Sequence, residues 1–243
     1  MGCDVFLAKF IAVLGGKGGV GRTTHAINLG LSLLNEGEDV ILIDGNFDSP
    51  ALSFHLSKSF HPVTVHDVMR NSNDLHKAIY EHESGLKIIP ADFSIHSSNG
   101  IDYEALFRNL QELHLFAEYV IIDGSAGLSH NTSQLLRLCD EVFIVTGPDR
   151  QSILEAKRII DLSNKLNKTI TGLIINKYKE SKYLVKKDAI EHFLGIPALS
   201  VIPEDFRFLK SMHYKKPYVY MFPKRNVSKQ YKDLAKRLSI KGY

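Results

Sequence analysis

The segment GGKGGVGRTT at residues 15–24 constrains the fold of this chain more than any other part of the sequence. It follows the apolar run FIAVL at residues 10–14, and it precedes apolar residues at helical spacing from Ile27 to Leu34. A strand, a glycine-rich loop and a helix in this order are typical of a phosphate-binding loop, because loop N–H groups and the helix N-terminus face one anion. This context favours such a loop over a turn that needs glycine only for positive φ angles.

The spacing within residues 15–24, called the phosphate loop below, assigns roles to several side chains. Gly16 and Gly21 keep the standard spacing, and the hydroxyl of Thr23 stands where a magnesium ligand is expected. Arg22 occupies the place of the standard lysine, and a second cation, Lys17, lies within the loop. We predict that nucleotide phosphates bind to Gly16, Lys17, Gly18, Gly19, Val20, Gly21, Arg22, Thr23 and Thr24.

Apolar runs typical of buried strands alternate with helical patterns along the rest of the chain. The strand candidates are 40–44, 86–90, 119–123, 141–146, 169–176 and 199–203, and the helix candidates are 64–69, 74–80, 103–115, 129–138, 149–166 and 228–238. This alternation predicts an α/β fold with a doubly wound, mostly parallel sheet that contains six or seven parallel strands, with helices on both faces. Because 243 residues show no repeat or linker, we expect a single domain over residues 1–243.

Composition argues against several other classes of protein. Hydrophobic residues make up 44% and charged residues 23% of the chain, as in ordinary globular proteins. No apolar run reaches the ~20 residues of a membrane span. The two cysteines, Cys3 and Cys139, do not form a CxxC pair, so we predict neither a disulfide framework nor a metal cluster. Since no secretory signal is evident, we expect a cytoplasmic protein, with peripheral association with the membrane or nucleoid left open.

Two predicted strands end in aspartates. Asp44 ends the strand at 40–44, and Asp123 ends the strand at 119–123. Ligands bind at the carboxyl ends of strands in open parallel sheets, and a nucleotide's magnesium needs oxygen ligands there. We therefore predict Thr23, Asp44 and Asp123 as metal ligands. The alternative is that each aspartate only caps the turn or helix that follows it.

Positive charge is concentrated near the C-terminus. Residues 213–243 hold nine of the 30 Lys and Arg residues but one of the 27 acidic residues, so the rest of the chain is net negative. A basic stretch of this kind can bind the DNA backbone or anionic lipid. A solvated basic face on a packed helix is the alternative that we favour.

Several segments together resemble the MinD/ParA family of deviant Walker A P-loop ATPases, most of all its archaeal MinD-like members. KGGVGRTT at 17–24 resembles the family's phosphate loop, with Lys17 in the place of the signature lysine. DGNFDSPAL at 44–52 resembles switch I, and IDGSAGL at 122–128 resembles the Walker B and switch II segment. The resemblance extends from about residue 10 to residue 238, with the motifs in the family's order.

This resemblance implies an ATPase that binds ATP or ADP with Mg²⁺ and forms a homodimer around ATP. Lys17 would then reach the nucleotide of the partner subunit. The resemblance further implies that Asn176, Pro203, Glu204 and Asp205 hold the base, and that Lys17, Asn46 and Asp48 are catalytic. Such a protein acts as a dimerisation switch on an unidentified protein partner, in placing the division site or in positioning cargo or DNA.

Three departures from the family pattern affect hydrolysis. Arg22 replaces the Walker lysine, and its larger, planar guanidinium is not equivalent to an ammonium group. Asn46 replaces the second switch I aspartate, so an amide stands where a carboxylate would orient the attacking water, unless Asp48 takes this role. Gly124 and Ser125 replace a Thr-Pro pair and are expected to loosen switch II. We therefore expect slow turnover.

Two other functions remain open. The first is a non-hydrolysing nucleotide-binding adaptor, which Arg22 and Asn46 favour. The second is a metal-cofactor maturation ATPase. The related metal-cluster carriers need paired cysteines at a dimer interface, and Cys3 and Cys139 do not supply such a pair.

Overall fold

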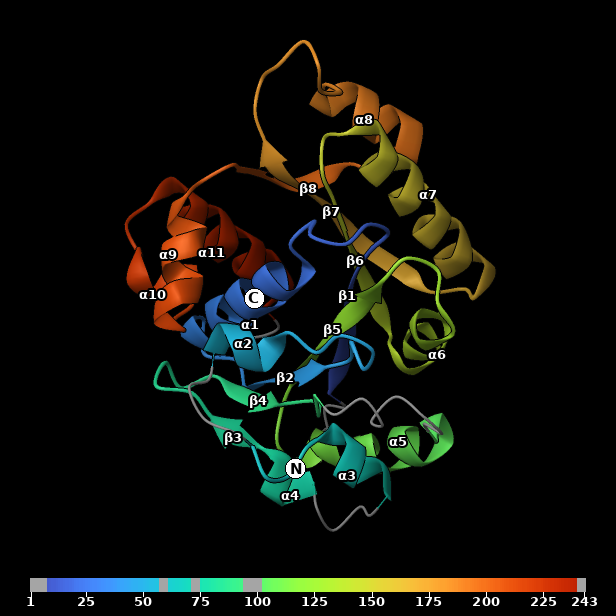
Figure 1. Ribbon diagram of the computed structural model, residues 1–243, viewed down its shortest axis with the longest axis vertical. Coiled ribbons are helices and arrows are strands. Elements are labelled where there is room, and N and C mark those ends of the chain that lie inside the picture. Colours follow the sequence, from blue (N-terminus) through green and yellow to red (C-terminus); the bar gives the residue numbers. More distant parts are fainter. Residues whose placement is uncertain (1–7, 57–60, 71–74, 94–101, 240–243) are drawn as a thin grey trace, which may run out of the picture.

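The computed structural model describes residues 8–56, 61–70, 75–93 and 102–239, which form one eight-stranded sheet with helices on both faces (Figure 1). The strand order is β3-β4-β2-β5-β1-β6-β7-β8. All neighbouring pairs are parallel except β3 and β4. The strands are β1 (Lys9–Gly15), β2 (Val40–Asp44), β3 (Tyr80–Glu81), β4 (Lys87–Ile89), β5 (Tyr119–Ala126), β6 (Glu141–Thr146), β7 (Thr169–Tyr178) and β8 (Ala198–Pro203). The predicted doubly wound α/β fold is confirmed.

Both faces of the central strands are buried, which explains their continuous apolar sequences. In β1, Phe10 and Ala12 join one hydrophobic core, whereas Ile11 and Val13 join the core on the opposite face. The same alternation holds in the neighbouring strand β5, where Val120 and Ile121 face opposite sides. One sheet therefore supports two cores.

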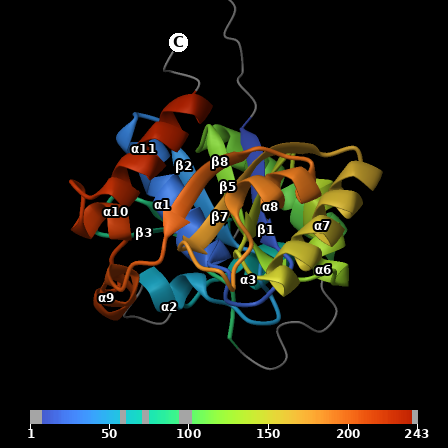
Figure 2. The same ribbon diagram turned by 90° about the horizontal axis from the view of Figure 1, so that it is seen from above.

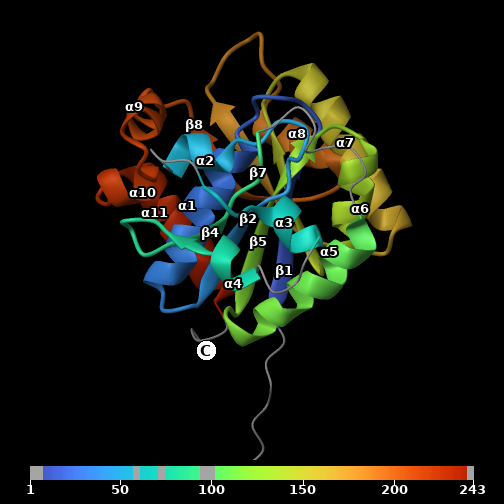
Figure 3. The ribbon, with the colours of Figure 1, turned by 60° about the horizontal axis from the view of Figure 1, so that its bottom comes forward.

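Each core is closed by its own layer of helices (Figure 2). On one face lie α1 (Arg22–Asn35), α2 (Leu52–Leu56), α10 (Tyr218–Met221) and α11 (Asn226–Leu238), with α9 (Arg207–Tyr214) beside them. On the other lie α3 (Val65–Arg70), α4 (Leu75–Ala78), α5 (Tyr103–Leu110), α6 (His130–Leu138), α7 (Arg150–Lys165) and α8 (Lys187–Leu194). In this second layer α3 packs against both α4 and α5 (Figure 3). No helix in the described part of the chain is long and apolar enough to cross a membrane.

Some predicted elements differ in their bounds. The helix expected at 103–115 becomes a 3-10 helix after Leu110, at Gln111–Leu115. The predicted helix 74–80 is α4 alone; Asp74 lies outside the described residues, and Tyr80 begins β3. β3, α2, α8, α9 and α10 were not predicted, because short helices and a two-residue strand have weak sequence periodicity.

The loop expected at 124–128 is a strand for its first three residues. β5 continues to Ala126, which pairs with Gly15 of β1. Gly124 is packed so closely that a Cβ there would lie 2.2 Å from Leu14 Cδ2. Ser125 is buried. Gly124 and Ser125 fall at an irregularity of the pairing between β1 and β5, between the pairs Val13–Asp123 and Gly15–Ala126. Their expected loosening of switch II stays a prediction.

Candidate functional site

The phosphate loop connects β1 to α1 at the carboxyl edge of the sheet. Two of its glycines, Gly19 and Gly21, have positive φ angles of 76° and 103°. At Gly21 a Cβ would also lie 2.3 Å from Asn176 Nδ2, so the residue must be glycine for both backbone and packing reasons. At Gly16 a Cβ would lie 2.1 Å from the Cβ of Glu155 on α7. The loop is therefore held tightly between β7 and α7.

Arg22 forms hydrogen bonds to backbone carbonyls of the phosphate loop. Its Nη1 donates a hydrogen bond to the Gly15 carbonyl at 2.9 Å and a longer one to the Lys17 carbonyl at 3.5 Å. Its Nε is buried without a hydrogen-bond partner among the described residues. Burial lowers the pKa of Arg22, although the nearby Asp123 raises it. The guanidinium thus bonds to loop carbonyls through Nη1, while its buried Nε–H lacks a partner among the described residues.

Lys17 makes an ion pair that the sequence analysis did not anticipate. Its Nζ lies 3.2 Å from Oδ1 of Asp149. Asp149 also caps the N-terminus of α7 by accepting a hydrogen bond from the Ser152 N–H. Partial burial raises the pKa of Asp149, but hydrogen bonds from Ser152 and Lys17 outweigh this and lower it. In this structure Lys17 therefore interacts with an acid of its own chain.

The two strand-end aspartates lie side by side, because Asp44 of β2 pairs in register with Asp123 of β5. Both carboxylate oxygens of Asp123 are buried and lack hydrogen-bond partners within the described residues. Burial and then the charge of Asp44 raise the pKa of Asp123, while Thr23 and Arg22 lower it. A buried carboxylate in this condition needs a cation or a proton.

Asp44 differs from Asp123 in its hydrogen bonds. It accepts hydrogen bonds from the backbone N–H groups of Asn46 at 3.1 Å and of Ala51 and Leu52 at 2.9 Å each. Burial nevertheless raises its pKa. The capping alternative therefore describes Asp44 in this structure, because these bonds hold switch I (residues 44–52) against the end of β2. It does not describe Asp123.

The donors at this edge suit a hard cation. The hydroxyl of Thr23 and the carboxylates of Asp44 and Asp123 offer oxygen ligands, which Mg²⁺ prefers, and the unpartnered oxygens of Asp123 are the clearest sign of a missing ligand. The described residues contain no group of three or more His, Cys, Asp or Glu able to hold a metal by itself. A metal here would thus need further oxygens from a nucleotide and water.

A pocket of about 570 Å³, called the main pocket below, opens beside the phosphate loop. Nine of the predicted binding residues line it: Gly19, Gly21, Arg22, Thr23, Thr24, Asn176, Pro203, Glu204 and Asp205. Apolar side chains on α9 and next to it form another wall of the pocket. His55 of α2 also lines the pocket and was not predicted. The pocket thus joins a polar phosphate end to an apolar end, as a nucleotide requires.

The four predicted base-binding residues are not equivalent. Asn176 donates from Nδ2 to the Val20 carbonyl at 2.7 Å, which joins the end of β7 to the phosphate loop. Asp205 accepts hydrogen bonds from the Arg207 N–H and side chain and from the Tyr218 hydroxyl. The carboxylate of Asp205 therefore anchors the start of α9. Glu204 is exposed and pairs with Lys179 at 2.8 Å. Asn176 thus contacts the phosphate loop, whereas Glu204 and Asp205 pair with basic side chains.

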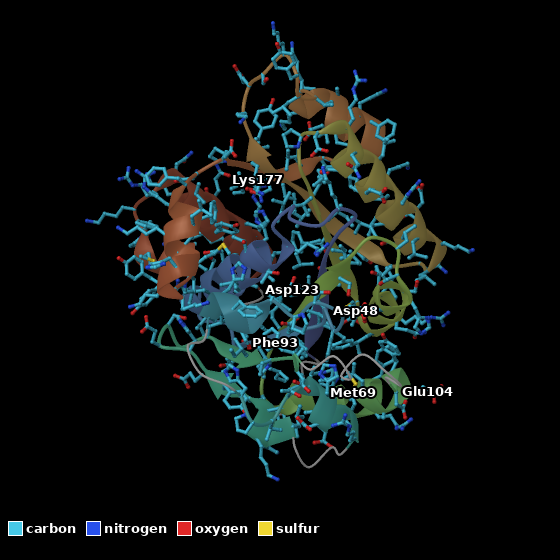
Figure 4. The ribbon with its side chains drawn as sticks, viewed as in Figure 1. Asp48, Met69, Phe93, Glu104, Asp123 and Lys177 are labelled. Carbon is cyan, nitrogen blue, oxygen red and sulfur yellow. The ribbon has the colours of Figure 1, made fainter. Side chains whose placement is uncertain are left out.

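Lys177 is a site residue that sequence reasoning missed. It has a φ angle of 54°, which is unusual for a residue other than glycine, and its Nζ donates to the Gly19 carbonyl at 2.9 Å. It lines the main pocket, and in the view of Figure 4 it lies on the opposite side of Asp123 from Asp48. The sequence signal that could have identified Lys177 is its position directly after Asn176.

The structure does not bring Asn46 and Asp48 into the main pocket. The Asn46 amide turns into its own loop, where Nδ2 donates to the Ser49 carbonyl at 2.5 Å. Asp48 is exposed and acts electrostatically on Tyr103 of α5, whose pKa rises to about 12 mainly through burial. In this structure the Asn46 amide is therefore engaged within switch I, and the catalytic roles of Asn46 and Asp48 stay predictions.

Asn131 of α6 links the two switch segments. Its Nδ2 donates to the Gly45 carbonyl of switch I at 2.8 Å. It also donates to the hydroxyl of Ser125 in switch II (residues 122–128). One buried amide therefore couples the segments that carry Asp44 and Asp123.

The remaining predictions concern the C-terminus and the cysteines. In α11, Tyr231 and Leu234 are buried while Lys229, Lys232 and Lys236 are exposed, which agrees with a solvated basic face on a packed helix. Cys139 is buried. Cys3 and residues 240–243 lie outside the described residues.

Comparisons with known proteins show which family this chain resembles in sequence and in fold. Residues 11–218 match the family model described as the CobQ/CobB/MinD/ParA nucleotide binding domain. An uncharacterized ATP-binding protein of Methanocaldococcus jannaschii is 31% identical over 96% of this chain and 88% of its own length. MinD of Pyrococcus horikoshii, solved with Mg-ADP, has a TM-score of 0.87 at 26% identity and 96% coverage of both chains. MinD in the MinC:MinD complex of Aquifex aeolicus has a TM-score of 0.85 at 26% identity, over 95% of this chain and 96% of that one.

Proposed function

Because the chain belongs to the CobQ/CobB/MinD/ParA nucleotide-binding domain family, we propose that it is an ATP-dependent dimerisation switch with slow ATP hydrolysis. The observation that carries this proposal is the buried Asp123 carboxylate, which lacks a partner among the described residues and lies next to Thr23 and the phosphate loop. A magnesium nucleotide would supply the missing positive charge. The similarity to a MinD solved with Mg-ADP supports the choice of nucleotide.

In this proposal the phosphate loop binds the phosphates through its backbone N–H groups and the N-terminus of α1. Thr23, Asp44 and Asp123 would hold Mg²⁺. Asn176 and Pro203 would contact the base in the main pocket, which they line. Glu204 and Asp205 would shape the pocket from its rim, because both already pair with basic residues.

Dimerisation follows from the position of Lys17. The family resemblance assigns this residue to the partner subunit's nucleotide, whereas here it pairs with Asp149 of its own chain at side-chain exposures of 38% and 41%. Exposed ion pairs stabilise by about 0–1 kcal/mol, so a triphosphate across an interface can outcompete Asp149.

Slow hydrolysis follows from Arg22 and Asn46. Phosphoryl transfer depends on placing charge at the phosphates and on orienting the attacking water. Arg22 directs Nη1 to the Gly15 carbonyl, and Asn46 directs its amide to the Ser49 carbonyl. Both groups must rearrange before they can act in catalysis. A weakened charge-assisted contact of this kind can reduce the rate about ten- to a hundredfold.

We propose that the switch acts in the cytoplasm on a protein partner, in placing a division site or in positioning cargo or DNA, with the chain working as one domain. Support comes from the Aquifex aeolicus structure, in which the related MinD is bound to MinC. In such a switch, ATP can favour the dimer only by as much as it binds the dimer more tightly than the monomer.

A non-hydrolysing adaptor is the second candidate function. The hydrogen bond from Asn46 to Ser49 favours it, because the amide to which the family resemblance assigns the orientation of the attacking water is engaged within its own loop. An adaptor would bind ATP and dimerise without turnover.

ATP turnover and molecular mass together test these alternatives. Turnover is measured for the wild-type protein, Arg22→Lys, Asn46→Asp and the double variant, and mass is measured by light scattering with Mg-ATP and with Mg-ADP. A switch predicts a dimer with Mg-ATP, slow wild-type turnover and about ten- to a hundredfold faster turnover in the double variant.

Dimerisation with no turnover in the wild-type protein would favour the adaptor. A wild-type rate equal to that of the double variant would show that Arg22 and Asn46 do not slow ATP hydrolysis. Failure of Mg-ATP and Mg-ADP to bind at millimolar concentrations would overturn the proposed function as a whole.

A further inference from the structure

Two consecutive residues at the end of β7 hold two consecutive carbonyls of the phosphate loop. Asn176 Nδ2 donates to the Val20 carbonyl at 2.7 Å, and Lys177 Nζ donates to the Gly19 carbonyl at 2.9 Å. Asn176 is buried, whereas Lys177 is exposed. The two bonds join residues 156 and 158 positions apart, so the fold places a strand end against the loop.

Packing does not hold the exposed tip of the loop, at Gly18 and Gly19. Within the described structure, a Cβ built on either residue would meet nothing within 4 Å beyond its chain neighbours. At Gly16 and Gly21 a Cβ would instead lie 2.1 Å and 2.3 Å from a neighbouring side chain. Because glycine is also conformationally permissive, the shape of the tip depends on its hydrogen bonds, and Lys177 supplies one of them.

The direction of a held carbonyl fixes the direction of the next N–H. In a planar trans peptide these two groups point to opposite sides, and no peptide bond in the described residues is cis. Since Lys177 bonds to the Gly19 carbonyl, the Val20 N–H points away from Lys177. Since Asn176 bonds to the Val20 carbonyl, the Gly21 N–H points away from Asn176. A phosphate loop binds an anion through consecutive N–H groups of this kind.

The backbone of Lys177 is a second sign of a specific role. Its φ angle of 54° lies in the left-handed region, where glycine, asparagine and aspartate are the usual residues. Such strained positions cluster at functional sites, where the side chain has a use that the backbone alone would not favour. The Lys177 side chain lines the main pocket and reaches the tip of the phosphate loop.

We propose that Lys177 is a positioning residue that holds the Gly19 peptide in the orientation that binds the phosphates of a nucleotide. The inference rests on the proposed nucleotide-binding function. It assigns Lys177 to the phosphates and not to the base, although the residue lines the main pocket. Without the lysine, the two glycines of the tip let this peptide rotate. Binding must then also order the tip, which weakens it.

The variant Lys177→Asn tests the proposal. Asparagine adopts the left-handed conformation readily, so the fold is kept, but its shorter side chain loses the hydrogen bond to Gly19. We expect the affinity for Mg-ADP, measured by calorimetry, to fall about fivefold, as for the loss of one hydrogen bond. Lys177→Arg keeps a long cationic donor and should retain most of the affinity.

Motion of the loop tip is measured in the nucleotide-free protein by NMR relaxation of the Val20 N–H, which belongs to the held peptide. We expect an order parameter of about 0.85 in the wild-type protein and below about 0.6 in Lys177→Asn. Lys182→Asn is the matched control, because it removes the same charge from an exposed lysine that lies over the Tyr183 ring. It should change neither the affinity nor the order parameter.

Mg-IDP separates the phosphates from the base, since its base carries an oxygen where adenine has the N6 amine. Lys177→Asn should weaken Mg-ADP and Mg-IDP by the same factor. A changed ratio of the two affinities would show a contact with the base and overturn the inference. Weaker binding with an unchanged order parameter would show that Lys177 acts on the phosphates directly, which also overturns it.

The outcomes separate this inference from the proposed function. If the wild-type protein binds Mg-ADP and Lys177→Asn binds it equally well, the inference is overturned while the proposed nucleotide site stands. If the wild-type protein does not bind Mg-ADP, both fall.

Discussion

At the scale of single residues, the site contains two buried charged side chains whose hydrogen bonds within the described residues are incomplete. Arg22 satisfies loop carbonyls but leaves Nε buried without a partner in the described structure, and Asp123 leaves both carboxylate oxygens in the same condition. Removing such groups from water without pairing them costs several kcal/mol. These costs persist in folded proteins mainly where a ligand offsets them, as at a nucleotide site.

The ion pair between Lys17 and Asp149 leads to a prediction about dimerisation. Asp149→Asn should strengthen the Mg-ATP-dependent dimer about two- to fivefold, because it frees Lys17 at the loss of one weak exposed ion pair. Asparagine remains a good N-cap, so α7 should begin as before. Lys17→Ala should abolish the dimer and leave binding of Mg-ADP largely intact. Sedimentation velocity with each nucleotide measures both effects.

Glu155→Gln is the matched control, since this acid pairs with Arg158 on the surface of α7 and not with Lys17. A dimer of normal strength in Lys17→Ala would show that Lys17 does not contribute to dimerisation. An unchanged dimer in Asp149→Asn would show that the pair does not restrain Lys17.

The raised pKa of Asp123 predicts an unusual dependence of stability on pH. An unfolded aspartate titrates near about 4, whereas the folded one keeps its proton to higher pH. As pH rises from about 4 towards the folded pKa, the unfolded state releases its proton first, so this residue makes nucleotide-free protein progressively less stable. Each unit of pKa elevation contributes about 1.4 kcal/mol.

Asp123→Asn should therefore be more stable than the wild-type protein at pH 7 to 8, and the difference should shrink towards pH 4. Thermal unfolding without nucleotide, across that pH range, measures it, with the exposed Asp48→Asn as the control. A constant difference between Asp123→Asn and the wild type at every pH would contradict the prediction. The same variant should lose Mg²⁺-dependent ADP binding.

At the scale of elements, the ends of β2 and β5 are held both by the backbone N–H groups that bond to Asp44 and by a side chain of the neighbouring helix α6. β5 continues through Gly124 and Ser125 to Ala126, because it pairs with β1 and because Gly124 packs against Leu14. Asn131 of α6 then bonds to Ser125 and to the Gly45 carbonyl. The rigidity of both switch segments therefore depends on α6.

Asn131→Ala should loosen both switch segments at once. It leaves the buried Gly45 carbonyl and Ser125 hydroxyl without this donor, at a cost of about 1–3 kcal/mol. Hydrogen–deuterium exchange should become about tenfold or more faster in residues 45–49 and 125–127. Gln134→Ala on the same helix, whose amide lies near His130, should leave exchange there unchanged. Faster exchange in one segment alone would show that Asn131 does not couple them.

At the scale of the whole molecule, one sheet is shared by two cores. Alternate residues of β1 and β5 belong to opposite cores, so neither helix layer can separate without exposing a face of the strands that the other layer needs. This arrangement supports the proposal of a single domain. It also brings α11 against α1, where the Tyr231 hydroxyl lies 2.6 Å from His25 Nδ1.

We therefore expect a single cooperative unfolding transition. Urea unfolding followed by far-UV circular dichroism and by the fluorescence of the ten tyrosines should give the same midpoint, since the chain has no tryptophan to dominate the signal. Mg-ADP should move both midpoints upward together. Two separate transitions would show that the helix layers unfold independently and would contradict a single domain.

The sequence by itself determined the strand–loop–helix at residues 15–24, the two strand-end aspartates and the α/β class, because these depend on local periodicity and on residue types at short spacing. It also pointed to Asn176 through the motif that contains it. The fold is confirmed, whereas the roles of these residues in binding and catalysis are proposals.

Tertiary structure decided what those residues contact. The ion pair of Lys17 with Asp149 joins residues 132 positions apart, and the contact of His25 with Tyr231 joins residues 206 positions apart. Such pairings arise only when the sheet brings distant strand ends and helices together, so no local sequence pattern predicts them. The difference between Asp44, which caps its own loop, and Asp123, which lacks a partner among the described residues, has the same origin. The two aspartates occupy equivalent places in the sequence pattern, and only the surrounding N–H groups distinguish them.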